Sequence, residues 1–201
     1  MSTSSNITAV DHRVDEDTRQ RRFGHAGAVL WLTGLSAAGK STLAMRLEER
    51  LMEEGYACYV LDGDNLRRGL NANLGFSPED RAENIRRVGE VAALFADAGL
   101  ICITAFISPY RADREQARRA AQHTGFHEIH LAANLAVCEE RDPKGLYRKA
   151  RAGELSQFTG IDAPYEVPLA PELCLDTGQE SVASSLERLL AYVREQCPRR
   201  C

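Results

Sequence analysis

Short apolar runs alternate with longer segments of helical periodicity along most of the chain. Five runs have the length and apolar content of buried strands: residues 28–32, 57–61, 100–106, 127–131 and 172–175. Three other segments repeat apolar residues at helical spacing, within residues 43–51, 88–95 and 182–193. Strands separated by helices favour right-handed crossovers, which build a parallel sheet with helices on both faces. The pattern therefore predicts a three-layer α/β fold.

The two ends of the chain differ from this pattern. Residues 1–27 are polar and charged, with Gly24 and Gly27 just before the first expected strand, and they indicate an N-terminal arm. We expect residues 28–195 to form a single domain, since a chain of 201 residues with 44% hydrophobic content suits one globular core. Residues 196–201 are expected to be a mobile tail.

Composition and charge narrow the range of partners. The formal net charge of -4 argues against a nucleic-acid partner, because such proteins usually carry a basic face. No apolar run approaches the roughly 20 residues that span a bilayer, and the N-terminus has no apolar signal region. We therefore expect a cytoplasmic protein with no membrane partner.

The six cysteines are interpreted as reduced thiols. Four of them lie in apolar or helical segments, and no two cysteines have the C-x-x-C spacing. Cys197 and Cys201 could form a disulfide or a metal pair, but nothing nearby completes a ligand set. Two free thiols in the tail are the favoured interpretation.

The first chemical motif directly follows the first expected strand. Residues 34–41, GLSAAGKS, fit the spacing G-x-x-x-x-G-K-[ST] between an apolar run and a helical pattern. Backbone N–H groups of such a turn can surround a β-phosphate, while Lys40 bridges the β and γ oxygens and Ser41 is placed for Mg²⁺. The alternative, a glycine-rich turn with a solvated lysine, leaves the agreement of all fixed positions unexplained.

Two carboxylates follow the second expected strand. Asp62 and Asp64, in Leu-Asp-Gly-Asp-Asn, suit Mg²⁺ coordination or orientation of an acceptor hydroxyl opposite the phosphate loop. A turn in which Asp64 or Asn65 caps a helix is the alternative. Because the third strand has no aspartate at its end, Asp62 is the favoured acidic group.

Three further segments carry candidate site residues. The third strand runs into Ile107-Ser108-Pro109-Tyr110-Arg111, where Ser108 is either a helix cap or a residue near the transferred phosphate. Residues 67–86 place Arg67, Arg81, Asn84 and Arg86 beside Phe76, which suits an anion attached to a flat base, although a solvated helix face remains the alternative. The basic residues 141–151 are expected to form a flap over the phosphates.

Taken together, these motifs resemble the adenylylsulfate kinase family. The resemblance runs from about His12 to the last helix and includes GHAGAVLWLTGLSAAGKST, LDGDNLRRGLNANLGFSPEDRAENIRR, FISPYR, RDPKGLYRKARAGE and FTGIDAPYE, in the family's order. It implies the fold of P-loop nucleoside triphosphate hydrolases with a lid at residues 141–165. The implied reaction transfers the γ-phosphoryl group of ATP, with Mg²⁺, to the 3′-hydroxyl of adenosine 5′-phosphosulfate (APS). The products are 3′-phosphoadenosine 5′-phosphosulfate (PAPS) and ADP.

The resemblance also assigns roles to residues of this chain. ATP is expected to contact Gly34, Leu35, Ser36, Ala37, Ala38, Gly39, Lys40, Ser41, Thr42, Arg141 and Arg148. The acceptor is expected to contact Asp64, Arg67, Phe76, Arg81, Asn84, Ile107, Ser108, Lys144, Gly145, Leu146 and Phe158. Catalysis is assigned to Ser108, Asp62 and Lys40, and Mg²⁺ to Ser41 and Asp62. Ser108 is the family's phosphoserine position, although direct in-line transfer needs only positioning and charge neutralisation.

The chain departs from the family at one position of the phosphate loop. Ala37 stands where glycine is usual, so a positive φ there would strain the loop by roughly 1 kcal/mol. The resemblance also implies a homodimer and raises an association with the ATP sulfurylase that makes the acceptor. Two other functions stay open at this point: a kinase for another small nucleotide or metabolite, and a poorly active nucleotide-binding regulatory subunit.

Overall fold

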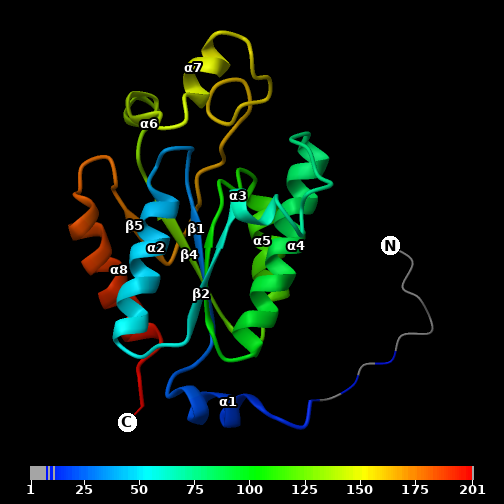
Figure 1. Ribbon diagram of the computed structural model, residues 1–201, viewed down its shortest axis with the longest axis vertical. Coiled ribbons are helices and arrows are strands. Elements are labelled where there is room, and N and C mark those ends of the chain that lie inside the picture. The colour runs from blue at the N-terminus through cyan, green and yellow to red at the C-terminus, as the bar shows by residue number, and fades with distance from the viewer. Residues whose placement is uncertain (1–7, 9, 11, 201) are drawn as a thin grey trace.

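A sheet of five parallel strands forms the centre of the computed structural model, which describes residues 8, 10 and 12–200 (Figure 1). The strands are β1 (Ala28–Thr33), β2 (Cys58–Asp62), β3 (Ile101–Ala105), β4 (Gly125–Leu131) and β5 (Leu173–Leu175). They lie in the order β2-β3-β1-β4-β5, and each neighbouring pair is parallel. All five expected strands are present, with ends shifted by at most two residues, so the predicted parallel sheet is confirmed.

Helices cover both faces of this sheet. They are α1 (Glu16–Phe23), α2 (Lys40–Glu53), α3 (Gly63–Leu66), α4 (Pro78–Asp97), α5 (Arg111–Ala120), α6 (Leu135–Arg141), α7 (Leu146–Arg151) and α8 (Val182–Gln196). Helices α2 and α8 lie on one face, and α4 and α5 lie on the other (Figure 1).

Alternate residues of β1 face the two helical layers. Leu30 and Leu32 pack in the core formed with α2 and α8, whereas Val29 and Trp31 pack in the core formed with α4 and α5. Every residue of β1 is buried, as expected for a central strand that is covered on both sides. The three-layer prediction is therefore confirmed.

The carboxyl ends of the strands meet at one edge of the sheet. In the sheet register Asp62 of β2 pairs with Ala105 of β3, and Thr33 of β1 pairs with His130 of β4. Helices α6 and α7 and the loop after them lie above this edge (Figure 1). The segments expected to carry chemistry thus converge at one end of the molecule.

The N-terminal arm contains a helix that the apolar pattern did not predict. Helix α1 begins after Asp15, whose side chain accepts a hydrogen bond from Thr18 N at 2.8 Å, and it ends at Gly24, whose φ is +76°. None of its residues is buried, so it has no apolar face for periodicity to reveal. The capping residues were the available signal.

The C-terminal residues contact the body of the protein. Cys197 is buried, the Arg200 N–H donates to Gly24 O at 2.7 Å, and Arg199 Nη1 donates to Glu54 O at 2.5 Å. The sequence predicts a mobile tail here, whereas the structure gives residues 197–200 these contacts. The sequence also predicts a free thiol at Cys201, but this residue lies outside the described part of the chain.

The other five cysteines are free, and only Cys174 is exposed among them. Over the described part of the chain, none of the helices combines the length and the apolar character needed to cross a bilayer.

Candidate active site

A cavity of about 1020 Å³ opens at the carboxyl edge of the sheet. The phosphate loop and the start of α2 form one end of it, and Arg67, Phe76 and Arg81 form the other. Residues of the lid, including Lys144 and Phe158, line a further part of the wall. A cavity of this size lies at the upper end of the range for small-molecule sites, which fits two nucleotides better than one.

The phosphate loop offers backbone donors to the cavity. Helix α2 begins after Gly39, which has no side chain to cap the first-turn N–H groups, so these donors remain available to an anion. The loop carbonyls are tied back by other segments: Tyr147 Oη donates to Ser36 O at 3.1 Å, and Thr177 Oγ1 donates to Ala38 O at 2.9 Å. At Gly34 a side chain would meet Leu131 O at 2.7 Å, which explains the glycine.

Lys40 is the buried cation of the loop. Its ammonium donates to Gly34 O at 2.9 Å and to Leu35 O at 2.6 Å, and the side chain is only 8% exposed. Burial lowers the pKa of Lys40 to about 8, while the Asp62 carboxylate favours the charged form. An anion placed in the loop would offset this cost of burial.

Ser41 and Asp62 lie side by side on the cavity wall. Ser41 Oγ donates to Asp62 Oδ2 at 2.7 Å, and Asp62 Oδ1 accepts from the Asp64 N–H at 3.0 Å. Asp62 is therefore the N-cap of α3 as well as a cavity residue. A hydroxyl and a carboxylate at this distance offer the oxygen ligands that Mg²⁺ prefers.

Two guanidinium groups and an aromatic ring form the other end. The Arg67 guanidinium lies 4.3 Å from the centre of the Phe76 ring, which is 64% exposed. Burial and then the charge of Arg81 lower the pKa of Arg67, because the two cations face a shared volume. Arg81 Nη1 donates to Thr159 Oγ1 at 2.8 Å and Nη2 to Gln157 O at 2.6 Å, so it also joins α4 to the lid.

A second contact joins the lid to the body of the site. Lys144 of the lid forms an ion pair with Asp64, which lies in the first turn of α3. In the lid itself, the Tyr147 and Phe158 rings pack edge to face with centres 5.0 Å apart. The lid therefore contacts the phosphate loop and the acceptor end at the same time.

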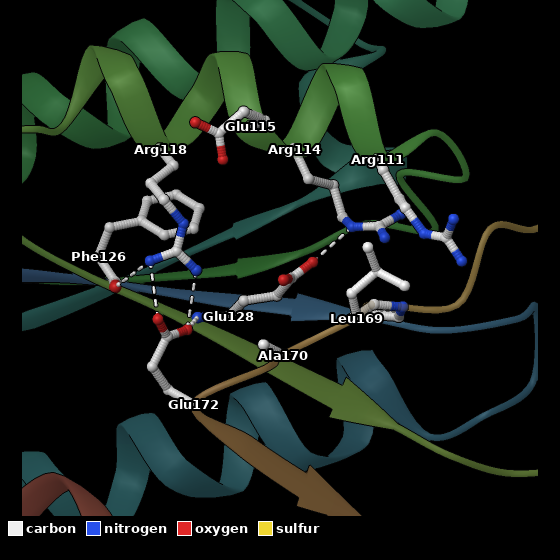
Figure 2. A pocket seen from close by; sticks show the side chains of 10 residues that line it. Arg111, Arg114, Glu115, Arg118, Phe126, Glu128, Leu169, Ala170 and Glu172 are labelled. Atoms are coloured by element: carbon white, nitrogen blue, oxygen red, sulfur yellow. Dashed lines mark hydrogen bonds and ion pairs between the residues drawn. The ribbon is translucent and has the colours of Figure 1, made fainter.

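Ser108 is held by a buried hydrogen-bond network. It is 2% exposed; its Oγ accepts from Trp31 Nε1 at 3.1 Å and donates to Thr33 Oγ1 at 3.0 Å. Arg114 Nη1 donates to Ser108 O at 2.7 Å, and Arg114 Nε donates to Glu128 at 2.5 Å. Figure 2 shows the Arg114 side chain reaching from α5 to the Glu128 carboxylate. The network fixes the backbone where β3 enters the cavity.

The site also concentrates backbone strain. Within residues 8, 10 and 12–200, three residues other than glycine have φ above +20°: Ala37 at 61°, Ser108 at 41° and Gln157 at 56°. They belong to the phosphate loop, the end of β3 and the lid. Such angles cost energy and cluster where surrounding structure holds a site in place.

Most residues expected at the site line the cavity. The wall includes residues 36–42, Asp62, Asp64, Arg67, Phe76, Arg81, Asn84, Ile107, Ser108, Arg141, Lys144, Leu146 and Phe158. Four expected residues are not on it: Gly34, Leu35, Gly145 and Arg148. Gly34 and Leu35 instead supply the carbonyls that hold Lys40, Gly145 is the N-cap of α7, and Arg148 is exposed on that helix.

Sequence reasoning missed part of the wall and its supports. Thr177, Glu180, Val182 and Ser185 line the phosphate end and lie more than 130 residues beyond the phosphate loop. Glu180 and Val182 flank Ser181, the N-cap of α8. That capping serine was the available signal, but it predicts a helix rather than a binding role.

Comparison with known proteins agrees with this geometry. The sequence profile described as Adenylylsulphate kinase matches residues 26–176. The chain belongs to the adenylylsulfate kinase family. The adenylyl-sulfate kinase of Staphylococcus carnosus is 55% identical over 98% of this chain and 98% of its own.

Solved structures of family members share the fold. The APS kinase of Mycobacterium tuberculosis, solved in complex with AMPPNP and APS, is 47% identical with a TM-score of 0.81, and the match covers 84% of this chain and 98% of that one. The hexameric APS kinase from Thiobacillus denitrificans is 34% identical with a TM-score of 0.67, over 90% of this chain and 32% of that one. The predicted membership of this kinase family is confirmed.

Proposed function

We propose that this chain transfers the γ-phosphoryl group of ATP to the 3′-hydroxyl of APS and releases PAPS and ADP. The observation that carries the proposal is the single cavity with a phosphate loop at one end and two guanidinium groups beside an exposed aromatic ring at the other. The loop suits the triphosphate, and the opposite end suits an adenine that carries an anionic group at its 5′ side.

The reaction exchanges one P–O bond for another. The bond from the γ-phosphorus to the β–γ bridging oxygen breaks, the 3′-oxygen bonds to the γ-phosphorus, and the hydroxyl proton leaves. Lys40 neutralises charge on the phosphate oxygens, and the loop N–H groups position them. Asp62 is our candidate for the group that orients the acceptor hydroxyl or holds the metal.

Mg²⁺ fits the residues at the phosphate end. Ser41 and Asp62 would hold it, and the ion would supply charge neutralisation across the phosphate oxygens. No three His, Cys, Asp or Glu side chains gather as a potential metal cage among the described residues. The proposal is therefore an ion that shares its coordination between this pair and the nucleotide.

The contacts of Ser108 favour direct transfer over a phosphoserine intermediate. Its hydroxyl donates to Thr33 Oγ1 within a buried network, so phosphorylation would remove that hydrogen bond and place a dianion on a side chain that is 2% exposed. In-line transfer instead leaves Ser108 to hold the backbone beside the acceptor.

Purified chain should be mixed with ATP, Mg²⁺ and a panel of acceptors that includes APS, AMP and small sugars. We expect ADP and PAPS to form in equal amounts with APS and far less ADP to form with AMP. Faster turnover with another acceptor would assign a different kinase activity. Binding of both nucleotides without ADP release would assign a regulatory subunit.

Three expectations about the protein's setting stay predictions. These are the homodimer, the association with ATP sulfurylase and the cytoplasmic location. The relative from Thiobacillus denitrificans is hexameric, whereas we expect a homodimer here, so light scattering should measure the oligomeric state of this chain.

A further inference from the structure

A buried asparagine supports the acceptor end from behind. Asn71 is 0% exposed and lies in the turn after α3, where its N–H donates to Leu66 O at 2.9 Å. Its side-chain Nδ2 donates to Asn84 Oδ1 at 3.0 Å. Its own Oδ1 is buried without a hydrogen-bond partner among the described residues. An unpaired buried amide oxygen is destabilising, and an apolar side chain of similar size would avoid it.

The single hydrogen bond of this side chain acts on a cavity residue. Asn84 lines the cavity with Arg67 and Arg81. Its Oδ1 is occupied by Asn71, while its Nδ2 has no partner in the described chain and is not sealed from solvent. An amide has donors on one side and an acceptor on the other, so fixing the oxygen also fixes the direction of the Nδ2 group.

We propose that Asn71 is a positioning residue that sets the polarity of the acceptor end. By donating to Asn84 Oδ1, it directs the Asn84 Nδ2 donor toward the anion that Arg67 and Arg81 attract. A turned amide would present its oxygen to that anion and repel it. The inference rests on the proposed function, because APS supplies the anion.

The leading test is Asn71→Leu, which removes the Nδ2 donor and replaces the amide with an apolar side chain of similar size. We expect the KM for APS to rise roughly ten- to a hundredfold, the value of one hydrogen bond to a charged group. The KM for ATP should change less than about twofold, and the melting temperature should stay within roughly 4 °C. A merely structural asparagine would lower stability and affect both substrates alike.

A matched control lies two residues away. Asn73 is in the same turn but exposed, and its side chain contacts Arg87 rather than the cavity. Asn73→Leu makes the same chemical change and should leave both KM values as they are in the wild type. An effect on APS from this control as large as that of Asn71→Leu would overturn the proposal.

A double-mutant cycle with Asn84→Ala separates positioning from packing. If Asn71 acts through the Asn84 amide, Asn71→Leu should change APS affinity little once that amide is gone. Equal losses in both backgrounds would show that Asn71 acts elsewhere and would overturn the proposal.

The dissociation constant of APS, measured by calorimetry for all four proteins, keeps this test apart from the proposed function. A wild type that binds APS but forms no PAPS would refute the function, and the cycle would still decide the role of Asn71 from binding alone. A wild type that forms PAPS with an uncoupled cycle would refute only the role of Asn71.

Discussion

The two ends of the cavity are built from different parts of the chain. At the phosphate end the loop side of the wall comes from the consecutive residues 36–42, and its donors are largely backbone N–H groups at the start of α2. At the acceptor end the contacts are side chains far apart in sequence: Arg81 reaches residues 76 and 78 positions away, and Lys144 reaches Asp64 across 80 positions. The phosphate end is formed mainly by consecutive residues, whereas the acceptor end combines side chains of the body with contacts to the lid.

This difference predicts different behaviour on binding. The phosphate loop is ready to receive phosphates with little rearrangement, because its donors are backbone N–H groups and Thr177, outside the lid, holds Ala38 O, although Tyr147 of the lid also holds Ser36 O. An acceptor site that shares Arg81 with the lid depends on the lid position. We therefore expect acceptor affinity to be more sensitive than ATP affinity to changes in residues 141–165.

The largest expected effect is at the phosphate end. Lys40→Ala should lower kcat by at least about a hundredfold, because the phosphate oxygens lose their buried cation at the moment of transfer. Steady-state kinetics with saturating APS measures this. Near-normal kcat would show that the loop works through its backbone alone and would remove Lys40 from catalysis.

Asp62→Asn tests the group that lies between the two ends. We expect kcat to fall on the order of a hundredfold while the KM of each nucleotide changes little, since the carboxylate is proposed to act on the metal or the hydroxyl. The amide oxygen can keep the bond from the Asp64 N–H that caps α3, while the amide NH2 can donate to Ser41 Oγ instead of accepting from it, so the fold should be kept. An unchanged kcat would transfer the role to Asp64.

Arg81→Ala should weaken the acceptor end selectively. Losing one charged hydrogen bond predicts a roughly ten- to hundredfold fall in kcat/KM for APS, with much less change for ATP. Thr159→Val is the matched control, because it removes one of the two lid contacts of Arg81, leaves the bond to Gln157 O and keeps the cation. A larger defect in the control would mean that lid attachment matters more than the charge. A defect confined to ATP would show that the two nucleotides have been placed in the wrong pockets.

The same comparison explains what the sequence could predict. The five strands and the phosphate loop follow from apolar runs and a fixed local spacing, and the structure contains them all. The bonds of Arg114 to Ser108 and Glu128, and of Thr177 to Ala38, join residues that no local pattern relates. The basic cluster beside Phe76 supplied Arg81 and the family resemblance supplied Phe158 as site residues, but neither predicted the contacts of Arg81 with the lid.

A pH series examines the cost of burying Lys40. With a pKa near 8 in the folded protein against 10.5 as its ordinary value, the folded state binds fewer protons than the unfolded state between these limits. Stability should therefore rise with pH across this window relative to Lys40→Met, whose side chain does not titrate. The relative gain should be on the order of 3 kcal/mol in urea unfolding from pH 8 to 10.5. A constant difference between the two proteins would contradict a depressed pKa.

The smallest expected effect concerns the strain at Ala37. Its φ of 61° meets the condition under which the alanine strains the loop, so Ala37→Gly should remove about 1–2 kcal/mol of left-handed strain. The glycine also increases the conformational entropy of the unfolded chain, which lowers stability by about 0.4–1 kcal/mol. The net stabilisation is therefore roughly 0.5 kcal/mol.

Ala38→Gly is the matched control for Ala37→Gly. Ala38 is fully buried and is not among the positive-φ residues, so the same substitution there should destabilise the protein by about 1 kcal/mol. Urea unfolding of both variants gives the comparison, and kcat of Ala37→Gly should stay near that of the wild type. Two losses of equal size would mean that the loop tolerates Ala37 without strain. A gain in stability from Ala37→Gly and a loss from Ala38→Gly would show that the phosphate loop, although built from consecutive residues, contains a strained backbone at Ala37 that the surrounding structure maintains.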